Sequence, residues 1–190
     1  MTTANAATHK YDLLLKGGRV IDPANNVDGL FDVAIVGRHI ARVSKDISPQ
    51  ESRRTADVSG LVVTPGLIDL HAHFYGYAAA VLPDAHCLPE GTTTAVDVGG
   101  SGHLTFDDFD RTIISRSKTN VFALLNIAGE GMVGLPEQDM EGMSVDLTSA
   151  KIAQRPDRIV GVKVAHYQGP GWQPLDRGVQ AAENTGVFVM

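Results

Sequence analysis

Two histidines separated by one residue, His71 and His73, are the strongest chemical signal in the sequence. They lie at the end of an apolar run, residues 66–73, whose composition predicts a β-strand. Because side chains alternate along a strand, both imidazoles would project from one face and could bind one divalent metal ion. Asp69 shares that face, where it would orient a metal ligand or cap backbone groups. Two satisfied structural histidines are the alternative interpretation.

A single lysine within a run of valines is the second signal. Lys163 lies in the segment 158–167, where alternation places Val162 and Val164 on the opposite face. The valines would pack against helices, and Lys163 would point into the interior, where a bare ammonium group is costly. A protonated lysine cannot ligate a metal, whereas its carbamate, formed with CO2, could bridge two metal ions. A lysine paired with a carboxylate, or one at a strand end in water, is the alternative.

Other polar residues near the predicted strand ends carry weaker hypotheses. Each could contact a substrate or act as a loop or capping residue: Asp97, Asn126, Glu130, Glu137 and Asp139. His166 also lies near a strand end, but alternation places it opposite Lys163 and it receives no role. The GGSG segment at 99–102 lacks the lysine and the spacing of a phosphate-binding loop.

Composition excludes several classes of protein. The chain has 190 residues, 43% of them hydrophobic, and a net charge of −6, which excludes a disordered chain and disfavours nucleic-acid binding. One cysteine excludes a disulfide framework and favours a reducing compartment, so we expect a cytoplasmic protein. No secretory signal is apparent, and no apolar run approaches the ~20 residues that span a bilayer. We expect a small-molecule substrate and neither a nucleic-acid nor a membrane partner.

The pattern of predicted elements changes near residue 64. We expect residues 1–9 to form a flexible tail and residues 10–63 to form short strands, with a hairpin turn at Gly37-Arg38. Residues 64–190 alternate strand and helix patterns, which predicts a parallel sheet or barrel. Strands are predicted at 66–73, 92–100, 121–131, 158–167 and 186–190, and helices at 105–118, 146–155 and 174–185.

Four segments resemble one enzyme superfamily. VVTPGLIDLHAHFYG (62–76) and GTTTAVDVGGSG (91–102) resemble the amidohydrolase superfamily. SKTNVFALLNIAGEG (117–131) and IVGVKVAHY (159–167) narrow the resemblance to its dihydroorotase-like branch, in particular to the amidohydrolase/deacetylase metallohydrolases.

The resemblance implies an α/β fold that is larger than this chain. Members have a metal-dependent (β/α)8 TIM barrel and a small β-sandwich built from both chain ends, and such a barrel alone takes ~250 residues. We therefore expect residues 64–190 to be the first half of the barrel, truncated in strand 5, and residues 10–63 to be the first sandwich strands. The chain is then expected to be a fragment of the full enzyme. One half of a split enzyme and a non-catalytic half-barrel that serves as an interaction module are the alternatives.

The resemblance also implies roles for matching residues. His71 and His73 match the metal-binding pair of the first barrel strand, and Lys163 matches a lysine that relatives carry as N6-carboxylysine bridging two divalent ions, typically zinc. In relatives, later strands supply further ligands and an acid–base aspartate that has no match here, so the catalytic residue stays unassigned. The implied reaction is metal-activated hydrolysis of a cyclic amide, an N-acyl amino acid or a related ester. A homo-oligomer of the full-length form stays open.

Overall fold

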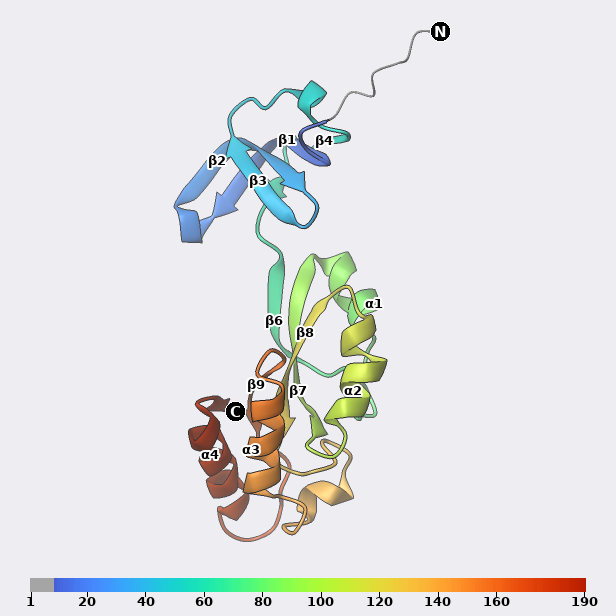
Figure 1. The fold of residues 1–190 in the computed structure, drawn as a ribbon, viewed down its shortest axis with the longest axis vertical. Helices are drawn as coiled ribbons and strands as arrows, with labels where there is room; N and C mark the ends of the chain where they lie inside the picture. The colour runs from blue at the N-terminus through green and yellow to red at the C-terminus, as the bar shows by residue number, and fades with distance from the viewer. Residues whose placement is uncertain (1–8) are drawn as a thin grey trace. The chain divides into compact units, whose positions relative to one another are not determined.

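The computed structural model describes residues 9–190. The chain divides into two compact units, and the boundary in the sequence lies between Pro65 and Gly66. Each unit is described by itself (Figure 1). The tail expected at residues 1–9 lies, apart from His9, outside the described residues. Within the described part of the chain, no helix is long and apolar enough to cross a membrane.

The first unit is one mixed sheet with strand order β3-β2-β1-β4, and β5 pairs with β1 beside β4. The first three strands form consecutive antiparallel hairpins, and β2 and β3 flank the two-residue turn predicted at Gly37-Arg38. Gly37 has a φ of +57°, a left-handed conformation that glycine adopts without steric cost. The elements are β1 (Leu13–Asp22), η1 (Pro23–Asn25), β2 (Val27–Val36), β3 (His39–Ser44), η2 (Pro49–Glu51), β4 (Thr55–Asp57) and β5 (Val62–Val63).

The second unit is a parallel sheet with strand order β10-β9-β8-β7-β6, so that strands consecutive in the chain are neighbours. Helices follow the strands, as expected for repeated βα units (Figure 1). The strands are β6 (Leu67–Ala72), β7 (Thr92–Gly102), β8 (Asn120–Asn126), β9 (Ile159–Lys163) and β10 (Phe188–Val189). The helices are α1 (Pro83–Cys87), η3 (Leu88–Glu90), α2 (Phe106–Thr112), η4 (Ile114–Arg116), η5 (Leu135–Gln138), α3 (Val145–Gln154) and α4 (Gln173–Thr185).

Apolar side chains fill both faces of this sheet. The larger cluster includes Phe106 and Phe109 of α2, which pack with Leu125 and Ile159 of the strands. Leu124 lies on the other face with two valines of β7. This division of neighbouring residues between two faces is what strand alternation requires in a sheet buried on both sides.

Three predicted elements are too long. The strand predicted at 121–131 ends at Asn126, because the Asn126 side chain accepts the N–H of Ala128 and turns the chain. The strand predicted at 158–167 ends at Lys163, and His166 has a left-handed φ of +61° that no strand accommodates. The helix predicted at 105–118 breaks after α2 into the short η4.

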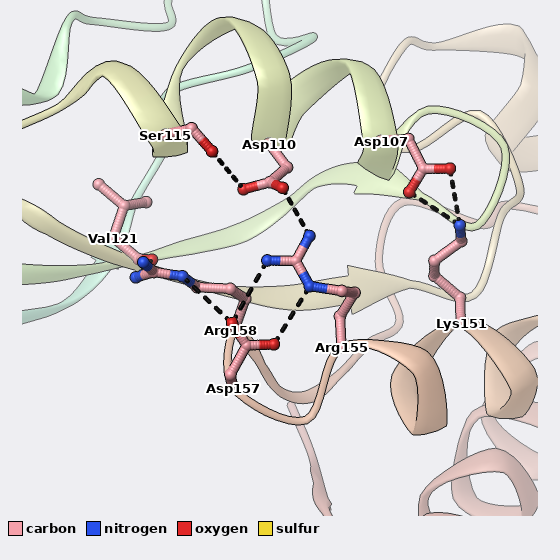
Figure 2. Close-up of polar contacts among 8 residues, drawn as sticks. All are labelled: Asp107, Asp110, Ser115, Val121, Lys151, Arg155, Asp157 and Arg158. Atoms are coloured by element: carbon pink, nitrogen blue, oxygen red, sulfur yellow. Dashed lines mark hydrogen bonds and ion pairs between the residues drawn. The ribbon is translucent and has the colours of Figure 1, made fainter.

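A polar network joins α2 to α3 on the surface of the unit (Figure 2). Arg155 donates from Nη1 to Asp110 Oδ2 at 2.5 Å and from Nε to Asp157 Oδ1 at 3.1 Å. Lys151 donates from Nζ to both carboxylate oxygens of Asp107 at 2.9 Å. Arg155 also lies over the ring of Phe106 at 5.7 Å, so its planar guanidinium group covers the apolar core as well as pairing with acids.

We expect Arg155→Met to destabilise the second unit by about 1–3 kcal/mol, because it leaves the partly buried Asp110 without its cation. The measurement is urea unfolding followed by the fluorescence of the single tryptophan, Trp172, which lies in this unit. Arg111→Met is the control, because the Arg111–Asp108 pair is largely exposed and should contribute less than about 1 kcal/mol. Equal losses in the two variants would contradict the assignment.

Candidate metal centre at the carboxyl ends of the strands

His71 and His73 lie at the carboxyl end of β6 with their rings edge to face. Their ring centroids are 5.5 Å apart and their planes meet at 80°. His71 is exposed and His73 is half-buried against the ring of Tyr77, 4.9 Å away. The Nδ1 atom of His73 is buried and has no hydrogen-bond partner among the described residues. A buried polar atom without a partner is costly, so a ligand that binds this nitrogen would remove that cost.

Electrostatics links this histidine pair to other groups at the same edge of the sheet. The pKa of His73 is lowered, first by burial and then by the charges of His71, Lys163 and His166. The lowered pKa favours the neutral imidazole, which is the form that ligates a metal.

Lys163 ends β9 and is half-buried. Burial lowers the pKa of its ammonium group, and no ion pair of Lys163 occurs within residues 9–190. Its aliphatic stem packs on the backbone of Gly99, where an added Cβ would lie 2.6 Å from Lys163 Cγ. Val162 and Val164 face Gly178 of α4 instead, as alternation predicts. A lysine held with a lowered pKa beside a glycine is suited to react as a free amine, which is what carbamate formation needs.

The Asp69 side chain forms a hydrogen bond with the backbone and not with an imidazole ring. Its Oδ1 accepts the backbone N–H of His71 at 2.9 Å. Of the two roles that the sequence leaves open for Asp69, the structure therefore shows the backbone cap.

The donor set fits part of a metal centre. Among the residues that the structure describes, no group of three or more His, Cys, Asp or Glu side chains could hold a metal ion. Two imidazoles with one buried unpartnered nitrogen and a partner-free lysine do fit an incomplete set of nitrogen and carbamate ligands. Any further ligands must come from outside these described residues.

Two of the weaker sequence candidates, Asp97 and Asn126, are almost fully buried. Their side chains form hydrogen bonds with backbone groups. Asp97 accepts the N–H of Phe74 at Oδ2 and the N–H of Gly100 at Oδ1, each at 2.7 Å. Burial raises the pKa of Asp97 to about 6. Asn126 donates from Nδ2 to the carbonyl of Gly99 at 3.2 Å. Neither residue is placed to contact a solvent-borne substrate directly.

Sequence reasoning missed the pairing of Glu137 with His166. Glu137 is 3% exposed, and its Oε1 lies 3.0 Å from Nδ1 of His166. Because strand β9 ends at Lys163 and His166 has a positive φ, alternation cannot place His166, and the assumption that it lies opposite Lys163 does not apply. The pair lines an open hollow of about 740 Å³, with Tyr77, Met132, Val133 and Gln138 among the other lining residues. In the sequence, the only sign of a site here is the glycine-rich loop that precedes Glu137.

Comparison with known proteins gives this arrangement a family. A deacetylase from Enterococcus faecalis is 32% identical over 157 residues, which are 80% of the chain and 41% of the deacetylase. A dihydroorotase from Clostridium acetobutylicum is 29% identical over 139 residues, 69% of the chain and 33% of that enzyme. A crystal structure of a dihydroorotase matches with a TM-score of 0.78 and 26% identity, over 94% of the chain and 50% of its own. The chain belongs to the dihydroorotase-like amidohydrolases.

The family accounts for the two sheets. The parallel sheet of β6 to β10 corresponds to the N-terminal part of an amidohydrolase TIM barrel, and the sheet of β1 to β5 corresponds to part of the sandwich. No family model matches the chain. The chain spans half of the solved dihydroorotase, and less than half of the two curated relatives named above.

One further solved structure shares the fold. N-acyl-D-glutamate deacylase from Bordetella bronchiseptica, crystallised with zinc and a phosphonate inhibitor, matches with a TM-score of 0.67 over 95% of the chain and 44% of its own. At 19% identity this likeness concerns the fold alone.

We expect Gly99→Ala to displace Lys163, because the added methyl group would overlap the lysine stem. Gly91→Ala is the matched control: Gly91 has a φ of +77°, close to the +87° of Gly99, but an added Cβ there meets no atom within 4 Å. Both variants carry a backbone strain of about 1–3 kcal/mol, and Gly99→Ala should lose at least about 1 kcal/mol more in urea unfolding. Equal losses would show that Lys163 is not held by Gly99.

Proposed function

We propose that this chain contributes the first metal ligands of a metal-dependent hydrolase that cleaves amide or acyl bonds. The substrate would be a cyclic amide, an N-acyl amino acid or a related ester. The observation that carries the proposal is the shared edge of the sheet, where β6 ends beside the His71–His73 pair and β9 ends at Lys163, which has no ion pair among residues 9–190. Similarity to a deacetylase and to dihydroorotases supports the same reaction class.

The residues of the chain would prepare the centre as follows. His71 and His73 offer neutral nitrogen lone pairs, and Asp69 holds the backbone of His71. Lys163, as N6-carboxylysine, would offer two carbamate oxygens in place of its amine. When bound, two divalent ions, zinc in our proposal, supply a hydroxide near neutral pH and polarise the scissile carbonyl.

The hollow beside the centre is the candidate substrate site. Nδ1 of His166 lies 3.0 Å from Oε1 of Glu137, and an ionised carboxylate would accept a hydrogen from this nitrogen. Nε2 would then be the ring nitrogen that is offered to a substrate. Apolar side chains of Met132 and Val133 line the same hollow. This mixture of apolar walls and one oriented polar group is typical of small-molecule sites. The acid–base residue of the reaction would come from outside the described residues.

A split enzyme is the second candidate, because the chain spans only 41% of the deacetylase and 50% of the solved dihydroorotase. The genomic sequence that follows the codon for Met190 separates the candidates. A continuing reading frame with the later barrel strands supports one longer enzyme. A neighbouring frame that encodes those strands supports a split enzyme, and neither would favour a non-catalytic half-barrel.

We expect the purified 190-residue chain to hold fewer than two zinc ions per monomer after dialysis and to lack hydrolase activity, because its described residues supply only part of a ligand set. Metal analysis by mass spectrometry, together with an assay on N-acyl amino acids and cyclic amides, checks this. Two tightly bound zinc ions on a monodisperse monomer would contradict it.

In the complete protein, His71→Ala and Lys163→Ala should each lower bound zinc and reduce turnover by at least about 100-fold, since losing even an outer partner of a metal ligand costs 10–100-fold. His39→Ala is the control, because this exposed histidine lies in the other unit and should change neither. Wild-type zinc content and turnover in either ligand variant would refute the ligand assignment.

A further inference from the structure

Asp97 is a fully buried carboxylate that pairs with backbone only. Its exposed fraction is 0%, and both of its oxygens accept backbone N–H groups. No ion pair of Asp97 occurs in the part of the chain that the structure describes. A buried charge without a cation is costly, and burial raises the pKa of Asp97 to about 6. An apolar residue at this position would leave the N–H groups of Phe74 and Gly100 without an acceptor, so the carboxylate is needed where these two backbone segments meet it.

The two hydrogen bonds of Asp97 join both parts of the candidate metal centre. Oδ2 accepts from Phe74, the residue that follows His73, and so holds the chain where it leaves β6. Oδ1 accepts from Gly100, the residue that follows Gly99. Gly99 is the surface on which the stem of Lys163 packs. One side chain therefore links the backbone beside the histidine pair to the backbone beneath the lysine.

A third strand reinforces the same peptide. Asn126 of β8 donates to the carbonyl of Gly99, and Asn126 lies opposite Lys163 in the β8–β9 register. The N–H of Ile127 in turn donates to the carbonyl of Lys163 at 2.9 Å. The Gly99-Gly100 segment is thus held from one side by Asp97 and from the other by Asn126.

We propose that Asp97 is a positioning residue for the metal centre, which sets the spacing between the His71–His73 pair and Lys163 before a metal ion binds. The proposal rests on the proposed function, because it assigns these three residues to one centre. It concerns a residue that touches neither metal nor substrate and acts through Phe74 and Gly100.

Asp97→Asn is the test, because it keeps the shape of the side chain and removes the charge. In Asn the NH2 group, which only donates, replaces one of the two oxygens, so one of the N–H groups of Phe74 and Gly100 would face a donor instead of an acceptor. Asp84→Asn is the matched control. The Asp84 carboxylate also accepts two backbone N–H groups, from Lys118 at 2.9 Å and Thr119 at 2.8 Å, but it does so just before β8 begins, at the opposite end of the sheet.

Zinc titration calorimetry on the 190-residue chain is the first readout. We expect Asp97→Asn to weaken zinc affinity by about 10–100-fold, the usual effect of losing a residue that orients metal ligands, and Asp84→Asn to leave it within about twofold. Bound Co2+ should also show a shifted visible absorption band only in Asp97→Asn. Wild-type zinc affinity and an unshifted Co2+ band in folded Asp97→Asn would overturn the proposal.

A metal-free readout separates the proposal from the function on which it rests. If the incomplete ligand set of the 190-residue chain binds neither zinc nor Co2+, the ligand assignment is decided by the His71→Ala and Lys163→Ala variants of the complete protein. The NMR signals of the His73 ring and the Lys163 stem still report placement: they should move in Asp97→Asn and not in Asp84→Asn, and unmoved signals overturn the proposal. If Asp97→Asn does not fold, Asn126→Asp, which turns an acceptor toward the carbonyl of Gly99, is expected to shift the Lys163 signals, and unshifted signals again count against the proposal.

Discussion

Parallel pairing of consecutive strands is the constraint on which the rest of the second unit depends. Ala72 lies opposite Asp97, Gly102 opposite Asn126, and Asn126 opposite Lys163. Because parallel strands run in one direction, these pairings bring the ends of β6, β7, β8 and β9 to the same edge of the sheet. Residues almost a hundred positions apart in the chain thereby become neighbours, and the loops that follow the strands surround them.

Charged side chains are paired on the helix-covered surface of this unit and unpaired at the carboxyl edge of its sheet. On the helical surface, Arg155 and Lys151 meet carboxylates directly, and the acids of α2 bind the cations of α3 (Figure 2). At the carboxyl edge, Lys163 has no acidic partner among residues 9–190, and Asp97 has no cation. Burial lowers the pKa of Lys163 and raises the pKa of Asp97, and both shifts favour the neutral form of the group. Paired charges stabilise the packing of helices, whereas ionisable groups whose pKa values are shifted by burial are typical of sites that bind a ligand.

The family comparisons and the geometry both concern only part of an enzyme. The likeness to a solved dihydroorotase covers 94% of the chain and 50% of that enzyme. The geometry brings the histidine pair and the lysine to one edge but supplies only part of a ligand set within the described residues. The hollow beside His166 is our candidate for part of the substrate site of the complete protein.

The sequence alone determined the order of strands and helices in the second unit, the hairpin turn at Gly37-Arg38 and the face that Val162 and Val164 present to α4. These follow from local periodicity, which alternation and turn chemistry express within a few residues. The motif residues His71, His73 and Lys163 were also evident, since their spacing and their apolar surroundings are properties of short segments.

Only the tertiary structure decided where strands β8 and β9 end, that Asp97 holds backbone instead of a ligand, and that Glu137 pairs with His166. Each of these depends on a contact between distant segments: Asp97 with Phe74, Glu137 with a residue 29 positions later, and Lys163 with Gly99. Periodicity carries no information about such contacts, because the partner of a buried polar group is chosen by the three-dimensional fold and by the cost of leaving that group unpaired.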